Sequence, residues 1–287
     1  MEFTCLADLK CELGESPVWD DRRELLFFVD ILAPAIHAIR LDGSGLRTWP
    51  MPAPVGSIGL TQSGRLIAAL KHDLALFDPE SGALQPFTKL PADEPQCNRL
   101  NDGKVGPDGA FWVGTMHDEP ERQPIGALYR VDASGRAERK ADGATVSNGL
   151  AWTADGERMF YADSRGPWID RWRFDRWTGS MSDRERFAEP GEMGRPDGAS
   201  CDAEGSYWSA GVSAGRLNRF LSDGQLADSI ETPVPAPTMP CFGGPDFRTV
   251  FLTSLSEGRA DGGTLSGGLF AADSPVAGFA PWRFLDI

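Results

Sequence analysis

Histidine is scarce in this sequence, and the scarcity excludes several kinds of site. The 287 residues contain three histidines, which argues against a metal centre or a nucleophile system built on imidazole. The five cysteines are odd in number and form no CxxC pair, so we expect reduced thiols and no disulfide framework. No Gly-x-Ser-x-Gly segment is present to place a nucleophilic serine on a strand-to-helix turn. The chemistry of this chain must therefore come from other side chains.

Long apolar runs and excess positive charge are also missing. The longest apolar runs have the length of a strand, so we expect no transmembrane segment. Residues 1–5 lack the basic start and apolar core of a signal peptide, which predicts a cytoplasmic protein. Lys and Arg number 28 against 42 Asp and Glu, a net charge of −14. This balance disfavours nucleic acid and anionic membranes as partners and favours cations. We expect a monomer or a weak dimer.

The sequence does contain a repeat. A short strand, a turn rich in Gly, Pro, Asp and Asn, and a second β-rich run recur six times, most clearly over Arg99–Met116. The equivalent residues of the six copies are Glu15, Gly56, Asn101, Asn148, Asp197 and Met239, at spacings of 41, 45, 47, 49 and 42 residues. Units of about four strands at such a period predict an all-β, six-bladed β-propeller with four-stranded antiparallel blades. An open pair of sandwiched sheets is the alternative, which the six-fold register disfavours.

Further strands follow the repeated pair in most copies. Third strands are expected over residues 35–41, 74–77, 127–131, 169–174, 216–220 and 268–271, and more polar fourth strands over 47–50, 84–90, 136–140 and 184–188. The extended segment Phe3–Cys11 precedes the first copy, so we expect it to pair with the last blade and close the ring. No linker interrupts the chain, which predicts one propeller domain over residues 1–287.

Equivalent positions at one end of the innermost strands surround the mouth of a propeller's tunnel. Three of them carry oxygen ligands, Glu15, Asn148 and Asp197, and Asn101 is a fourth polar residue. Two carboxylates and an amide carbonyl suit a hard divalent cation and leave coordination positions open. Taken singly, the Asn-Gly and Asp-Gly pairs are ordinary turn formers and Glu15 an ordinary loop charge. Their shared register favours a metal site.

Six segments resemble the signatures of the SMP-30/gluconolactonase, or regucalcin-like, family. They are Leu13–Trp19, Arg99–Lys104, Gly114–Met116, Ser147–Trp152, Pro196–Gly198 and Cys241–Gly244. The resemblance extends in order over essentially the whole chain. It implies a six-bladed propeller that holds one divalent metal in its tunnel and hydrolyses sugar lactones to aldonic acids.

The resemblance also implies roles for single residues. Glu15, Asn148 and Asp197 match the metal ligands, and Asp197 matches the residue proposed as general base. The positions that contact the substrate's hydroxyls are matched by Arg99, Asn101 and Glu119. Independently of the resemblance, His117 and Lys104 are candidates for the pocket rim, and His117 is an alternative candidate for a ligand. Residues 120–125 and 257–267 show no family pattern, and both segments could reach the pocket mouth.

Several points stay open at the level of sequence. Oxygen ligation permits Ca²⁺ or Zn²⁺, which we expect first, and also Mg²⁺, Mn²⁺ or Fe²⁺. The sugar is not named by any residue pattern. Two alternatives to a sugar lactonase are a paraoxonase-like esterase or lactonase of non-sugar substrates and a non-catalytic calcium-binding regulator. A protein-interaction propeller is a third, disfavoured because it needs no polar, liganded tunnel.

Overall fold

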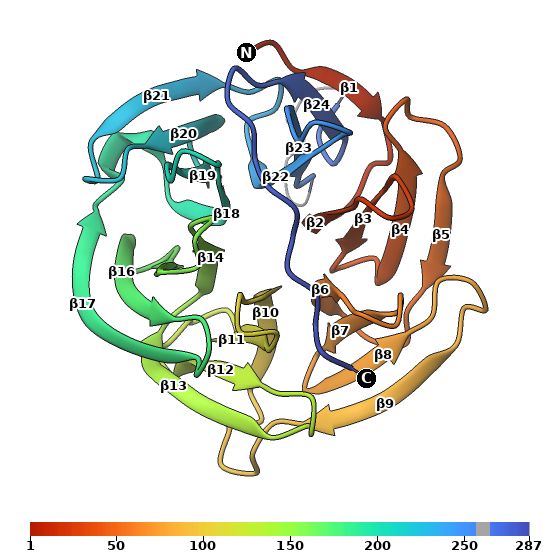
Figure 1. Cartoon of the computed structure of the whole chain (residues 1–287), viewed down its shortest axis with the longest axis vertical. Helices are drawn as coiled ribbons and strands as arrows, with labels where there is room; N and C mark the ends of the chain where they lie inside the picture. Colours follow the sequence, from red (N-terminus) through yellow and green to blue (C-terminus); the bar gives the residue numbers. More distant parts are fainter. Residues whose placement is uncertain (257–264, 287) are drawn as a thin grey trace.

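A computed structural model of the chain describes residues 1–256 and 265–286. Its strands form six four-stranded antiparallel sheets, arranged as blades around a central axis (Figure 1). The first three blades contain β2 (Gly14–Asp20), β3 (Leu25–Asp30), β4 (Ala35–Arg40) and β5 (Arg47–Pro50); β6 (Val55–Leu60), β7 (Leu66–Leu70), β8 (Asp73–Phe77) and β9 (Leu84–Lys89); and β10 (Asn98–Val105), β11 (Phe111–His117), β12 (Gly126–Val131) and β13 (Ala137–Ala144).

The other three blades follow the same order from the axis outward. They contain β14 (Ser147–Trp152), β15 (Arg158–Asp163), β16 (Trp168–Asp175) and β17 (Ser180–Ala188); β18 (Pro196–Cys201), β19 (Tyr207–Gly211), β20 (Arg216–Phe220) and β21 (Leu226–Glu231); and β22 (Pro237–Gly243), β23 (Thr249–Ser254), β24 (Leu269–Asp273) and β1 (Thr4–Ala7). The predicted six-bladed propeller is confirmed.

The ring closes through the N-terminal strand, as predicted. β1 pairs antiparallel with β24, with Thr4 opposite Ala271 and Cys5 opposite Phe270. The last blade is therefore completed by the first strand of the chain (Figure 1). The strand β21 was not predicted, because the sequence of Leu226–Glu231 is polar and largely exposed, as suits an outermost strand.

Apolar side chains fill the space between neighbouring blades. Between the first two blades, for example, Phe27, Val29 and Ile36 of the first meet Ile58 and Phe77 of the second, and all five are almost fully buried. The β-branched and aromatic residues that alternate along these strands are the ones that pack well on a pleated surface. The same packing around the ring holds the six innermost strands in fixed positions about the axis.

Each innermost strand carries a β-bulge near its start. The register shifts fall between Glu15 and Val18, Val55 and Ser57, Leu100 and Gly103, Asn148 and Ala151, Pro196 and Ala199, and Pro237 and Pro240. The equivalent residues predicted from the repeat all lie at these bulges. A bulge redirects the side chain of the residue it contains, so the repeat places the side chains of its polar members, Glu15, Asn101, Asn148 and Asp197, around the axis.

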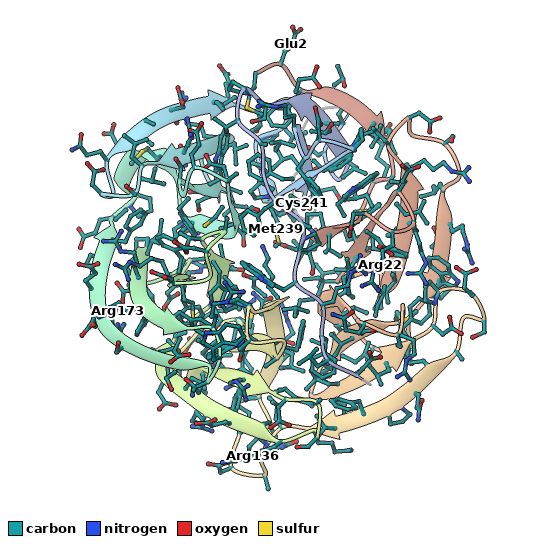
Figure 2. All side chains as sticks on the ribbon, in the orientation of Figure 1. Glu2, Arg22, Arg136, Arg173, Met239 and Cys241 are labelled. Carbon is teal, nitrogen blue, oxygen red and sulfur yellow. The ribbon has the colours of Figure 1, made fainter. Side chains whose placement is uncertain are left out.

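The two ends of the tunnel differ. The C-terminal segment crosses the ring at the ends of the innermost strands (Figure 1), where the Phe284 amide donates to the Leu60 carbonyl at 2.8 Å. Phe279 and Trp282 of this segment line a small inner cavity, together with Lys104 and Met239. Figure 2 shows Met239 and Cys241 close to the axis. The starts of the innermost strands, at the other end, are where the polar ring residues lie.

Helical structure contributes little to the fold. Within residues 1–256 and 265–286, the structure has one short 3-10 turn, Gly191–Met193, and no α-helix. Accordingly, none of the described segments is a helix with the length and apolar character needed to span a bilayer.

Candidate metal and substrate site

A cavity of about 200 Å³ lies at the starts of the innermost strands. Its lining includes Glu15 from β2, Asn148 from β14 and Asp197 from β18, the three predicted metal ligands. Arg99 and Asn101 of β10, two of the predicted substrate contacts, line the same cavity. The repeat register therefore brings five of the predicted site residues together from four different blades.

A chain of hydrogen bonds connects the polar residues around the cavity. Arg99 Nη1 donates to Asn101 Oδ1 at 2.7 Å, and Asn101 Nδ2 lies 3.4 Å from Asn148 Oδ1. Asn148 Nδ2 donates to Ser164 Oγ at 2.8 Å, and that hydroxyl donates to the Pro196 carbonyl at 2.6 Å. Because its NH₂ group is engaged by Ser164, Asn148 keeps its amide oxygen as the ligand atom.

Glu15 is fixed by a local distortion of the backbone. The next residue, Ser16, has φ of 49°, in the left-handed region that is costly for a side chain other than glycine. In this conformation the Ser16 amide donates to Glu15 Oε2 at 3.0 Å, and Ser16 Oγ accepts from the Ile58 amide at 2.9 Å. The Ser16 amide thus fixes the Glu15 carboxylate, and the hydrogen bond to Ile58 of the second blade fixes Ser16.

The carboxyl groups of the cavity are shielded from solvent and repel one another when they are ionised. Burial, and then the nearby charge of Asp197 and Asp102, raises the pKa of Glu15 well above its ordinary value. Burial, with a further contribution from Asp102, raises the pKa of Asp197 to about 8. Asp102 is buried; its Oδ2 accepts from the Leu150 amide at 2.9 Å, while Oδ1 has no hydrogen-bond partner among the described residues. Acidic groups held this closely favour either protons or a cation.

The donor set fits a divalent cation by its chemistry. Glu15 and Asp197 supply carboxylate oxygens and Asn148 an amide oxygen, the ligand types of hard cations. The set is sparse, because no group of three or more His, Cys, Asp or Glu residues in the described part of the chain is arranged to hold a metal. A cation here would be bound by three protein groups, and its remaining positions would face the cavity.

Glu119, the third predicted substrate contact, lies outside the cavity lining, and the residues around it connect it to Arg99. Arg99 is buried, and its Nε pairs with Asp118 Oδ1 at 3.1 Å. Glu119 does not line the cavity; its side chain is 62% exposed and lies 3.6 Å from His117 Nε2. His117 is itself buried at the end of β11, with Nδ1 accepting from the Gln123 amide at 3.1 Å. Neither Glu119 nor His117 is therefore part of the cavity wall, although Arg122, a few residues further on, is.

Lys104 lies in a different place from the predicted pocket rim. It lines the inner cavity near the C-terminal segment, and its Nζ donates to the Ala199 carbonyl at 2.7 Å. Burial lowers its pKa, and the nearby Asp102 partly opposes this effect. Because a strand advances about 3.3 Å per residue, three residues separate Lys104 from the level of Asn101 by roughly 10 Å. Lys104 therefore belongs to the tunnel interior.

The charged cavity residues Arg122, Arg165 and Arg195, and the hydroxyl of Ser164, were not found by the sequence reasoning. Arg122 comes from the 120–125 segment that shows no family pattern and was expected near the mouth. Arg165 and Arg195 lie on loops, where no periodicity identifies the direction of a side chain. The other atypical segment, 257–267, falls mostly outside the described residues, which resume at residue 265.

Known proteins match the chain over nearly its whole length. A family described as "SMP-30/Gluconolactonase/LRE-like region" matches residues 13–256. A 6-deoxy-6-sulfogluconolactonase from Pseudomonas putida is 37% identical, over 96% of this chain and 96% of the relative. An L-arabinolactonase from Azospirillum brasilense is 34% identical, over 99% of this chain and 95% of the relative.

A solved structure agrees with these sequence relatives. The crystal structure of a calcium-binding protein, regucalcin from Agrobacterium tumefaciens, superposes with a TM-score of 0.92 at 27% identity, covering 98% of this chain and 96% of that one. The predicted family resemblance is thereby confirmed, and the chain belongs to the SMP-30/gluconolactonase/LRE-like family.

Proposed function

We propose that this protein hydrolyses a sugar-derived lactone, an aldono-1,4- or 1,5-lactone, to its aldonic acid with the help of one divalent metal ion. The observation that carries the proposal is the shared cavity of Glu15, Asn148, Asp197, Arg99 and Asn101. Membership of a family whose relatives include lactonases supports the reaction class. Glu15, Asn148 and Asp197 are the proposed ligands, and Ca²⁺ or Zn²⁺ the first candidates.

The ligand set explains what a bound ion would contribute. A divalent ion held there would polarise the lactone carbonyl as a Lewis acid and stabilise negative charge on its oxygen. Asn148 is oriented for this role through Ser164. Desolvation raises the pKa of both Glu15 and Asp197, that of Asp197 to about 8, so a bound cation would favour their ionised forms.

The remaining residues have roles in proton transfer and orientation. Asp197 is proposed as the general base that accepts a proton from the attacking water. Burial favours the protonated form of Asp197, whereas a bound dication favours the carboxylate, and the balance sets its strength as a base. Arg99 and Asn101 border the ligand set and are assigned contacts with the sugar hydroxyls. Glu119 is proposed to reach only a substrate that extends toward the end of β11.

A panel of substrates and metals tests the proposal. Acid release would be followed with a pH indicator on chelator-stripped protein, for aldonolactones, apolar lactones and aryl esters, with each divalent metal added back. We expect metal-dependent hydrolysis of an aldonolactone above the other substrates. A preference for apolar lactones or aryl esters would favour a paraoxonase-like enzyme. Metal binding without hydrolysis of any substrate would favour a calcium-binding regulator.

A further inference from the structure

Arginine is concentrated around a cavity in an otherwise acidic protein. Four arginines line the cavity, namely Arg99, Arg122, Arg165 and Arg195, against two carboxylates, Glu15 and Asp197. The chain as a whole carries a net charge of −14. If Glu15 and Asp197 hold a divalent ion, as the proposed function requires, their charge is neutralised and the cavity becomes strongly positive. A neutral sugar gives no electrostatic reason for such a lining.

Two of the four arginines are engaged in ion pairs and hydrogen bonds with neighbouring residues of the protein. Arg99 pairs with Asp118 at 3.1 Å, and Arg122 donates to the His117 carbonyl and lies 3.8 Å from Asp118. By contrast, neither Arg165 nor Arg195 forms an ion pair with any residue in the described ranges 1–256 and 265–286. Among the described residues, their guanidinium groups are the cavity cations that no carboxylate contacts at ion-pair distance.

Hydrogen bonds anchor the backbone of these two arginines on loops that are joined to each other. The Arg165 amide donates to Asp163 Oδ1 at 2.8 Å, and the Arg195 amide donates to Ser213 Oγ at 2.9 Å. Between them, the Ser164 hydroxyl donates to the Pro196 carbonyl at 2.6 Å and so joins the two loops. Both side chains start from anchored positions on adjacent blades, which lowers the entropic cost of using them together.

Arg195 lines the cavity two residues before Asp197 and is half-buried there. Arg165 is exposed at the same mouth, where an incoming ligand can meet it.

We infer that Arg165 and Arg195 form a subsite for an anionic substituent on the sugar lactone, outside the lactone group itself. Guanidinium groups bind the oxygens of sulfonate, phosphate and carboxylate through paired, charge-assisted hydrogen bonds. The substrate class is thus an aldonolactone bearing one of these groups. The inference rests on the proposed function and adds the substituent to it.

The test compares charged and neutral lactones on the metal-loaded protein. The charged substrates are 6-deoxy-6-sulfo- and 6-phosphogluconolactone and glucarolactone, each compared with neutral gluconolactone of the same ring size. Wild type should favour at least one charged substrate by about tenfold in kcat/KM, the effect of one or two charge-assisted hydrogen bonds. The preference should shrink as salt is added. The substrate with the largest ratio identifies the anionic group.

Variants then separate the subsite from a general effect of charge. The double change Arg165→Gln and Arg195→Gln should remove most of the preference, mainly through a higher KM for the charged lactone. The double change Arg136→Gln and Arg173→Gln removes the same charge at the periphery of the ring (Figure 2) and should keep the preference.

Three results would overturn the inference. They are a wild-type enzyme that prefers the neutral lactone to all three charged ones, an equal loss with both substrates in the Arg165/Arg195 variant, and the same loss of preference in the peripheral control. In each case the enzyme would still hydrolyse a lactone, so the proposed function would stand. If no lactone is hydrolysed with any metal, the proposed function itself fails, and the inference fails with it.

Discussion

The Ser164 hydroxyl decides how Asn148 is presented to a metal. It accepts from Asn148 Nδ2 at 2.8 Å and donates to the Pro196 carbonyl, beside Asp197. Groups of this kind orient ligands, and their loss typically costs ten- to a hundredfold in metal affinity. We expect Ser164→Ala to weaken divalent metal binding by about tenfold, measured by calorimetric titration. Ser134→Ala, in an exposed turn, should not change the affinity; equal affinities for both variants would contradict the role of Ser164.

The buried carboxylates predict an unusual pH dependence for the metal-free protein. Burial raises the pKa of Glu15 and of Asp197, the latter to about 8, above the value of about 4 in an unfolded chain. Between these values the folded state holds protons that the unfolded state has released, so the free energy of unfolding falls as pH rises. We expect the Tm of chelator-treated protein to fall between pH 5 and pH 8.

Metal and a variant provide the controls for this experiment. Excess divalent metal should remove most of the fall, because the cation replaces the protons. Asp197→Asn cannot titrate and should flatten the slope. A slope that is the same in wild type and Asp197→Asn would show that other groups cause the pH dependence.

At the residue scale, the sequence predicted the cavity positions that share a register or belong to a family motif, as Arg99 does, and missed the arginines on the loops. Glu15, Asn148 and Asp197 recur at equivalent positions of the repeat, and the structure brings them into one cavity. Arg165 and Arg195 follow no period, because loop direction depends on contacts such as the bond between Ser164 and Pro196. A repeat therefore identifies a ring of side chains but not the loops above it.

At the scale of the element, the turn that joins the first two strands of a blade also holds the third strand in place. In the fifth blade, Asp202 is fully buried there and accepts from Trp208 Nε1 and from the Ser206 amide, both at 2.9 Å. Arg219 of the third strand pairs with it at 2.9 Å. The turn thus connects three strands through one carboxylate.

Removing that carboxylate should destabilise the blade without affecting the cavity. Asp202→Ala leaves the Trp208 N–H buried without a partner and removes one of the two carboxylates that pair with Arg219, the other being Glu204, which costs about 3 kcal/mol. Urea unfolding would measure the loss against Asp223→Ala, a change in an exposed turn. The interpretation fails if the two variants unfold at the same urea concentration.

The strands were more predictable than the site because their signal is repeated. The expected fourth strand at 47–50 coincides with β5, and the expected third strand at 216–220 coincides with β20. β21, by contrast, lacks an apolar face, since it packs on one side only, and it was not predicted. Outermost strands of this kind are specified by their neighbours more than by their own residues.

At the scale of the whole molecule, the ring depends on one short strand. β1 completes the last blade through its pairing with β24. Deleting residues 1–8 removes this closure, so we expect the Tm to fall by about 5–10 °C, equivalent to roughly 2–3 kcal/mol. Deleting the exposed residues 1–2 alone should leave it unchanged. An unchanged Tm after the longer deletion would mean that the ring closes by other contacts.

The central claim is that one divalent ion, held by Glu15, Asn148 and Asp197, is required for lactone hydrolysis. The most direct measurement is the rate of acid release from an aldonolactone as metal is returned to chelator-stripped protein, together with the amount of metal bound per chain. The account predicts a rate that rises in proportion to a single bound ion, and a folded Asp197→Ala variant that neither binds the ion nor hydrolyses the lactone. Full activity in the stripped protein, or wild-type activity in Asp197→Ala, would contradict it.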